Sequence, residues 1–271
     1  MPSPKLAAFD AVATMVIRDI LPSITTLSVP FAFAGGRVKA GGRATIIRLA
    51  TGSLAVFSPV ALTSVVLEKL TSLGTVRYII APNMTHHIHI SAWVTAFPNA
   101  NVICVEGLPE KREKDASTRG ITFSHVFTAQ NKTTLRITDE FDSEFGFEYV
   151  DAAPNKDLVF LHKPTRTLIE ADLLFSLPAT EQYSKVPEGV SSGILGRGVS
   201  SAFSLQGNMT WQKRALWYGV GSRNRQSFAE SFRRVFKWDF ERIIPCHGDV
   251  IETDAKATLE RVTDFFFNEK N

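Results

Sequence analysis

The sequence has few cysteines, no long hydrophobic run and almost no excess of one charge. Only Cys104 and Cys246 occur among 271 residues, so we expect no disulfide framework and predict a cytoplasmic protein. No window approaches the ~18 apolar residues that span a bilayer, and Lys5, Asp10 and Arg18 interrupt any signal-peptide pattern. A net charge of +3 is too small to indicate a nucleic-acid-binding face. We therefore expect a small-molecule substrate and neither a nucleic-acid nor a membrane partner.

The order of apolar runs and turn residues predicts a layered α/β fold. The composition, 44% hydrophobic and 21% charged, is that of a globular protein, and no break in it divides the chain, so we expect a single domain over residues 1–271. A strand, a polar loop, a helix and a second strand follow one another between residues 76 and 105, which is typical of a βαβ unit. We also predict a helical segment over residues 4–21, a helix at Ala61–Leu73 and a long loop or lid over residues 177–207.

Three of the six histidines, His86, His87 and His89, lie within four positions directly after the apolar run Val76–Ala81. Neutral imidazole is the commonest protein ligand for zinc, so such a cluster indicates a metal or proton-transfer site. The alternative is structural, because His86 and His89 also have the spacing of one helix face, with Trp93 beyond them. The residues of this segment alone leave both interpretations open.

Two further strand ends carry residues of the same kind. Asp172 follows the apolar run Thr167–Glu170, where a buried carboxylate needs a partner or a metal ion, although helix capping is the alternative. His247 follows the run Arg242–Pro245 and precedes a glycine, where a hydrogen bond within the turn is the alternative. In a layered α/β fold such strand ends lie together at one edge, which favours a shared site.

These features resemble the ordered metal motifs of the metallo-β-lactamase superfamily. The resemblance rests on the His-rich loop, on Ala-Asp-Leu-Leu-Phe around Asp172 and on Pro-Cys-His-Gly around His247, and it extends from about Pro30 to Ile251. The segments Tyr78–Phe97, Asn155–Tyr183 and Trp238–Ile251 are most similar to a branch common in fungi and known only as a domain of unknown function. The resemblance implies a four-layer αββα sandwich, one or two zinc ions at its edge, and hydrolysis of esters, thioesters, lactones or lactams.

The first motif of the superfamily, His-x-His-x-Asp-His, has no matching register here. If His87 and His89 are its first two histidines, the Asp-His positions fall on Ser91 and Ala92. If His86 and His87 stand for Asp-His, the two earlier histidine positions fall on Pro82 and Met84. A further histidine of the superfamily normally lies roughly twenty residues before the aspartate of the Asp172 motif, and none lies there in this sequence. We therefore expect one zinc ion rather than two, and a site without metal stays open.

The candidate site follows from these motifs. We expect metal ligands among His86, His87, His89, Asp172 and His247, of which the three clustered histidines need not all bind, and catalytic roles for His86, His87, Asp172 and His247. Glu181 and Tyr183 follow the strand end that carries Asp172, so they are candidates for a substrate wall. His125 is a further candidate for lining a pocket.

The predicted function is a metal-dependent hydrolase of an ester, thioester or lactone bond in a small molecule. The alternative is a metal-free lyase, isomerase or small-molecule binder on the same fold, using histidine acid–base chemistry. A homo-oligomer is compatible with either function.

Overall fold

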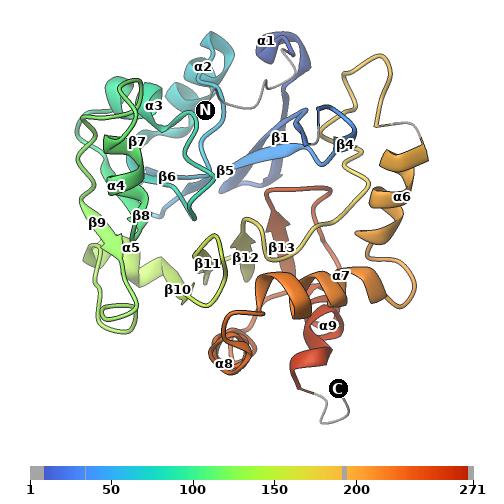
Figure 1. Cartoon of the computed structure of the whole chain (residues 1–271). Coiled ribbons are helices and arrows are strands. Elements are labelled where there is room, and N and C mark those ends of the chain that lie inside the picture. The colour runs from blue at the N-terminus through green and yellow to red at the C-terminus, as the bar shows by residue number, and fades with distance from the viewer. Residues whose placement is uncertain (1–8, 34, 191–193, 268–271) are drawn as a thin grey trace.

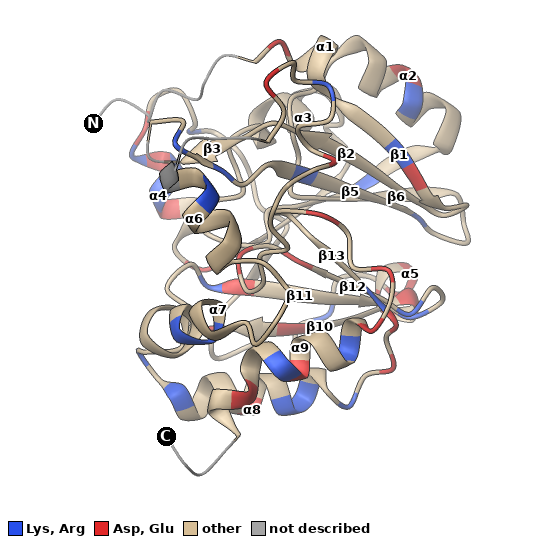
Figure 2. Cartoon of the chain, turned by 90° about the vertical axis from the view of Figure 1, so that its right-hand side faces the viewer, with Lys and Arg blue, Asp and Glu red and all other residues tan. Residues whose placement is uncertain are grey.

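The computed structural model describes residues 9–33, 35–190 and 194–267. Within them, two β-sheets face each other and helices cover the outer side of each, as the layers in Figures 1 and 2 show. Figure 2 also shows acidic and basic positions interspersed on the outer helices. This arrangement confirms the four-layer αββα sandwich. No helix in the described part of the chain is long and apolar enough to cross a membrane.

The first sheet, as far as the described residues show it, has seven strands in the order β1-β2-β5-β6-β7-β8-β9. Its first four strands pair antiparallel, whereas β6, β7, β8 and β9 run parallel. A separate hairpin, β3 and β4, leads into β5. The bounds are β1 Val16–Leu21, β2 Ile24–Val29, β3 Ala32–Phe33, β4 Val38–Lys39, β5 Gly42–Arg48, β6 Ser53–Phe57, β7 Thr75–Ile80, β8 Asn101–Val105 and β9 His125–Phe127.

The second sheet, within the same described residues, has four strands in the order β10-β11-β12-β13. Strands β10, β11 and β12 pair antiparallel, and β13 joins β12 in parallel. Their bounds are β10 Phe145–Val150, β11 Asp157–His162, β12 Thr167–Glu170 and β13 Arg242–Pro245.

The helices fall into two groups on the two outer faces. Helices α2 and α3 pack on β7, while α8 packs on β10 and α9 on β13. Helix α6 contacts the β3–β4 hairpin and α7, so it lies at one end of the sandwich (Figure 1). The bounds are α1 Ala11–Thr14, α2 Ser64–Leu73, α3 Ile90–Ala96, α4 Leu108–Glu113, α5 Asp139–Glu144, α6 Ile194–Ala202, α7 Thr210–Ala215, a π-helix Leu216–Val220, α8 Arg225–Val235, α9 Ala255–Thr263 and a 3₁₀ turn Asp264–Phe266.

Two expectations about local structure were wrong. In the described part of the segment 4–21, only Ala11–Thr14 is helical and Val16–Leu21 is the edge strand β1, because its β-branched residues pair with β2. Residues 4–8 lie outside the described part. The expected long loop over residues 177–207 contains α6, whose Gly196 and Gly198 lower its helix propensity and hide it from pattern reasoning.

Strand β11 shows how the sequence builds two hydrophobic cores. Successive side chains of a strand point to opposite faces, so Phe160 lies in the core between the sheets and packs on Phe57 with ring centroids 5.0 Å apart. The neighbouring Val159 belongs instead to the core under α8, together with Phe228. Each buried phenylalanine contributes about 1.5–3 kcal/mol, which fixes the two sheets and their outer helices as one framework.

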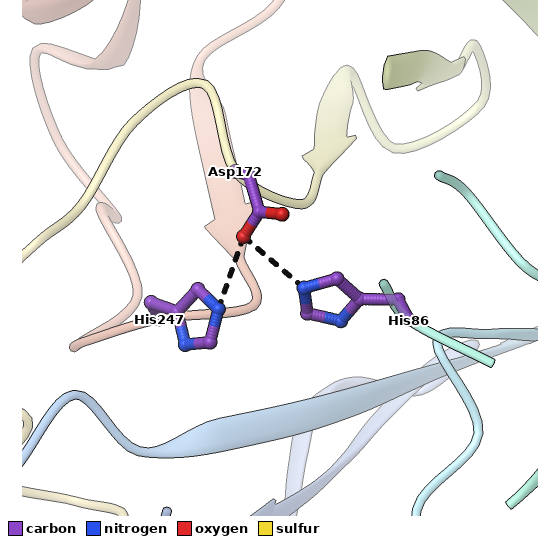
Figure 3. Close-up of side chains that lie close together, drawn as sticks. All are labelled: His86, Asp172 and His247. Carbon is purple, nitrogen blue, oxygen red and sulfur yellow. Dashed lines mark hydrogen bonds and ion pairs between the residues drawn. The ribbon is translucent and has the colours of Figure 1, made fainter. Parts of the chain in front are cut away.

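The parallel pairing of β12 and β13 aligns two of the predicted site residues. Glu170 and Pro245 are register partners, and each strand releases its site residue two positions later, Asp172 from β12 and His247 from β13. Both residues therefore emerge at the same sheet edge. The loop after β7 in the facing sheet delivers His86 toward them (Figure 3).

Candidate metal centre

Three side chains converge at this edge. The Oδ1 atom of Asp172 lies 3.2 Å from Nε2 of His86 and 3.1 Å from Nε2 of His247, as Figure 3 shows. Each residue offers one ligand atom, and these atoms all lie within 4.8 Å of one another. All three side chains are largely buried. Three strand ends from two sheets thus bring two imidazoles and one carboxylate to one point.

Asn83, which is completely buried, organises the loop that carries His86. Its Oδ1 accepts hydrogen bonds from the backbone N–H groups of Thr85 and His86, and it shares the single hydrogen of the Thr85 hydroxyl with Oδ2 of Asp172. Ser58, at the end of β6, lies 2.7 Å from Nδ1 of His86 through its Oγ. With Nδ1 held in this way, Nε2 is the nitrogen that faces Asp172.

The second carboxylate oxygen of Asp172 is fully occupied. It accepts hydrogen bonds from Nδ2 of Asn83 at 2.8 Å, Nδ2 of Asn155 at 2.9 Å and Oγ1 of Thr85 at 3.0 Å. These donors fix the orientation of the carboxylate. Its Oδ1 is consequently the oxygen presented to the two imidazoles.

His247 is held by the backbone of the first sheet. Its Nδ1 donates to the carbonyl of Gly41 at 2.6 Å, which leaves the lone pair of a neutral ring on Nε2. The phenyl ring of Phe175 stacks on the imidazole, with centroids 4.8 Å apart and planes 5° from parallel. The ring therefore has one orientation and one tautomer.

The turn around His247 depends on a buried arginine. Nη1 of Arg43 donates to the carbonyls of Pro245 and Gly248, each at 2.7 Å, so the guanidinium brackets the turn. Gly248 has a φ of +88°, and a Cβ there would lie 2.0 Å from the carbonyl oxygen of Ser176. Only glycine fits this close backbone approach.

The carboxyl groups around the cluster differ in charge. Burial opposes ionisation of Asp172, but the charge on His86 and the close contacts of Asp172 Oδ1 with the two imidazoles outweigh it and hold the pKa of Asp172 well below its usual value. Burial also opposes a charge on His86, yet the Cys246 sulfur and Asp172 raise the pKa of His86 well above its usual value. Asp172 therefore carries negative charge at neutral pH.

Two neighbouring carboxyls behave in the opposite way. Burial, followed by the Asp172 charge, raises the pKa of Asp157 to about 7, and burial with nearby negative groups raises the pKa of Glu170 well above its usual value. Each has one buried oxygen without a hydrogen-bond partner. Asp172 is thus the principal negative charge available to a cation at this edge.

The donor atoms fit one divalent ion of the zinc type. Two ligand atoms about 2.0–2.1 Å from a tetrahedral ion lie about 3.3 Å apart, and the two Nε2–Oδ1 distances are 3.2 and 3.1 Å. The far nitrogen of each imidazole is held by a protein oxygen, as metal-ligating histidines require. The two amide groups at Asp172 Oδ2, from Asn83 and Asn155, present hydrogens rather than lone pairs, so they offer nothing to a second ion there.

A cavity of about 390 Å³ opens beside the three ligand atoms. Apolar side chains form most of its wall, and His86, Asp172 and His247 share one side of it with Thr85 and Asn155. Its lining residues are Val29, Phe31, Phe33, Gly42, Arg43, Ser58, Pro59, Val60, Thr85, His86, Ile88, His89, Asn155, Asp172, Phe175, Val220 and His247.

The other two clustered histidines lie outside the three-residue cluster. Nδ1 of His87 accepts a hydrogen bond from Nη1 of Arg112 at 2.9 Å, and burial with the charges of Lys111 and Arg112 lowers the pKa of His87 to about 4. His89 precedes α3 and lines the cavity. His87 therefore ties the loop to α4, whereas His89 remains in reach of a substrate.

The three predicted substrate-binding residues, His125, Glu181 and Tyr183, are not among those that line the cavity. His125 lies on the edge strand β9. Glu181 binds Arg18 and Arg43 in ion pairs behind the wall, and the buried Tyr183 donates its hydroxyl to the carbonyl of Phe31 at 2.7 Å. Glu181 and Tyr183 thus support the wall from behind rather than facing the cavity.

Sequence reasoning missed the residues that hold the ligands in place. Asn83 and Thr85 lie in the same loop as His86, and Asn155 lies near the end of the short connection between β10 and β11, but none is a typical metal ligand. Ser58 has a positive φ of 53° at the end of β6, which no sequence pattern marks. Only Asn83 and Thr85 could have been identified from the sequence, because they lie at a strand end beside three histidines.

Solved structures of the metallo-β-lactamase fold resemble this chain over nearly its whole length. A metallo-β-lactamase from Pontibacter korlensis shares 11% identity at a TM-score of 0.57, covering 94% of this chain and 100% of its own. The metallo-β-lactamase FIM-1 from Pseudomonas aeruginosa, in its mono-zinc form, shares 8% at 0.55, covering 93% and 95%. The flavodiiron core of Flv1 from Synechocystis sp. PCC6803 shares 11% at 0.63, covering 94% and 62%. Such low identities establish the fold alone.

The model of one sequence family, described as a domain of unknown function (DUF4336), matches residues 36–217. The chain belongs to this family. A search of curated proteins finds no significant match.

Proposed function

We propose that this chain is a hydrolase that binds one zinc-type ion through His86, Asp172 and His247 and cleaves an ester, thioester or lactone bond of a small molecule. The observation that carries the proposal is the convergence of three ligand atoms, each within 4.8 Å of the others, in the wall of a cavity of about 390 Å³. A cavity of this size suits a small molecule. When bound, such an ion would polarise a carbonyl and activate water near neutral pH.

The surrounding residues keep the ligand atoms in place. Ser58 and the Gly41 carbonyl hold the far nitrogens of the two imidazoles. Asn83 and Asn155 hold Asp172 so that one oxygen faces the cluster. A site whose ligands are already oriented loses little conformational freedom on binding, which supports a tightly bound ion.

His89 is the remaining imidazole on the cavity wall. Burial lowers the pKa of His89, so its ring is neutral at pH 7 and able to accept a proton. We assign it the proton transfer that hydrolysis requires. The His89→Asn variant should therefore lower kcat by about 10²–10⁴-fold and leave zinc binding within threefold of the original chain.

The test is a zinc titration of the full chain by calorimetry, with elemental analysis and hydrolysis of 4-nitrophenyl acetate followed in parallel. We expect about one zinc ion per chain, activity that is lost on chelation and activity that returns with zinc. Asp172→Asn keeps the shape of the side chain but removes its charge. It should weaken zinc binding by more than roughly 10- to 100-fold, which is the usual effect of mutating a residue that only hydrogen-bonds to a metal ligand.

His125→Asn is the matched control, because it removes a histidine on the distant edge strand β9. Its zinc affinity and activity should equal those of the unmodified chain. Absence of stoichiometric zinc, or hydrolysis that survives chelation, would overturn the metal-dependent mechanism and favour metal-free acid–base chemistry.

A further inference from the structure

The cavity has aromatic rings beside the candidate metal ligands. Phe175 stacks on the His247 imidazole, and the ring of Phe33 lies 5.5 Å from it in an edge-on arrangement. Phe31 packs edge-on against Phe33, with centroids 4.8 Å apart. A substrate whose carbonyl reaches the ligand cluster would therefore place its adjoining group against phenyl rings.

Apolar side chains at the same cavity remain exposed to solvent. Phe33 is 41% exposed and Ile88 is 53% exposed, and both line the cavity. Val220, the last residue of the π-helix Leu216–Val220, is a further apolar residue of the cavity wall. An apolar ligand group would cover these exposed surfaces.

Away from the ligand cluster, the cavity wall, as far as the structure describes it, offers no free lysine or arginine to an acidic substrate group. Among the described lining residues, Arg43 is the only lysine or arginine, and its side chain is fully buried. Its guanidinium donates to Pro245, Gly248, Ser28 and Glu181. The other charged groups on the wall, His86 and Asp172, face each other at the ligand cluster at 3.2 Å, so neither is available to an acidic group farther along the substrate.

From these observations we infer that the cavity selects neutral substrates with an apolar, preferably aromatic, group next to the scissile carbonyl. The inference rests on the proposed hydrolase function for its chemistry, but the selectivity belongs to Phe33, Ile88 and Phe175 and to the buried state of Arg43. A volume of about 390 Å³ admits one aromatic ring with a short linker, near the lower end of the usual range of ligand pockets.

The first measurement compares three 4-nitrophenyl esters that share a leaving group, namely the acetate, the phenylacetate and the hemisuccinate, with the zinc-loaded chain. We expect kcat/KM for the phenylacetate to exceed that for the acetate by about tenfold or more, and the anionic hemisuccinate to fall below the acetate. The phenylacetate-to-acetate ratio should drop at least threefold in Phe33→Ser and in Ile88→Ser.

The matched control is Leu67→Ser, because Leu67 on α2 is also 41% exposed but does not line the cavity. Its ester ratio should be unchanged. All three substitutions lie at exposed positions, so loss of folding would not explain a change in selectivity.

The second measurement is independent of catalysis. Saturation-transfer NMR on the chelated chain should detect binding of phenylacetamide but not of acetamide, and Phe33→Ser should weaken that binding at least threefold. If phenylacetamide binds in this way while no ester is cleaved, the hydrolase proposal fails and the cavity inference stands. If phenylacetamide does not bind, if the hemisuccinate is the best ester, or if neither substitution alters the ratio, the cavity inference is overturned.

Discussion

Arg43 connects the two sheets at the site, so its removal tests how the His247 turn is built. The guanidinium is fully buried and donates to the carbonyls of Pro245 and Gly248, both at 2.7 Å, and to Glu181 at 3.3 Å. Arg43→Met keeps much of the side-chain volume and removes every one of these donors. Two buried carbonyls would then lack a partner.

The expected loss follows from these contacts. Each unsatisfied buried carbonyl costs about 1–3 kcal/mol, and breaking a buried ion pair costs about 3–5 kcal/mol. Glu181 keeps its contacts with Arg18 and Ser28, so the two costs are not simply additive. We expect Arg43→Met to lower the free energy of unfolding by about 3–5 kcal/mol and to weaken zinc binding about 10- to 100-fold, because His247 loses its fixed position.

Urea unfolding of the zinc-free chain measures the first effect. With a slope of about 3 kcal/mol per molar urea, the midpoint should fall by about 1–1.7 M. Arg18→Met is the control, because Arg18 binds the same Glu181 but is 39% exposed, and exposed pairs contribute at most about 1 kcal/mol. Adding Glu181→Gln to Arg43→Met should restore part of the loss. Equal midpoints for Arg43→Met and Arg18→Met would refute the assigned role.

Three further predictions concern single positions. Gly248→Ala should lower the free energy of unfolding by at least about 2 kcal/mol more than Gly120→Ala, since the two glycines have φ values of 88° and 87° but only Gly248 faces a backbone oxygen; equal losses in thermal unfolding would contradict this. Zinc titration should show His87→Asn within tenfold of the original affinity and His86→Asn without measurable binding; the reverse order would exclude His86 as the ligand. The pKa of Glu181 is lowered from 4.5, because the Arg43 charge and the hydrogen bonds to Glu181 outweigh burial. The ionised Glu181 therefore stabilises the fold above about pH 4.5, and this stabilisation disappears as the pH falls through the lowered pKa. In melting curves, Glu181→Gln should reduce the fall of melting temperature at acid pH, and an unchanged fall would contradict this role of Glu181.

The fold could be predicted from the sequence where local pattern and burial agree. Helix α2 ends at Leu73 before a glycine, and strand β7 lies within one residue of the apolar run that predicted it. The edge strand β1 could not be predicted, because its pairing with β2 is a tertiary contact that overrides a mixed local pattern. Helix α6 was missed because two glycines and two serines among its nine residues give it no helical signature.

The candidate site was predictable only in part, for a related reason. His86, Asp172 and His247 share a visible context, the end of a buried strand, and the register of β12 with β13 brings two of them together. His87 has the same context, but its ring turns to Arg112, a contact made across 25 residues. Sequence position could not indicate which of the neighbouring histidines faces the cluster, because the deciding partner lies on another element.

The hydrogen bonds to Asp172 also bear on the number of metal ions. A second cation beside Asp172 Oδ2 would have to displace three donors, from Asn83, Thr85 and Asn155. The oxygen of Asn83 is in turn committed to the loop that carries His86, so rotating its amide toward a metal would release that loop. Asn83 therefore binds both Asp172 and the His86 loop, and the same contacts that orient a first ion disfavour a second. A zinc titration that saturates at two ions per chain would contradict this argument.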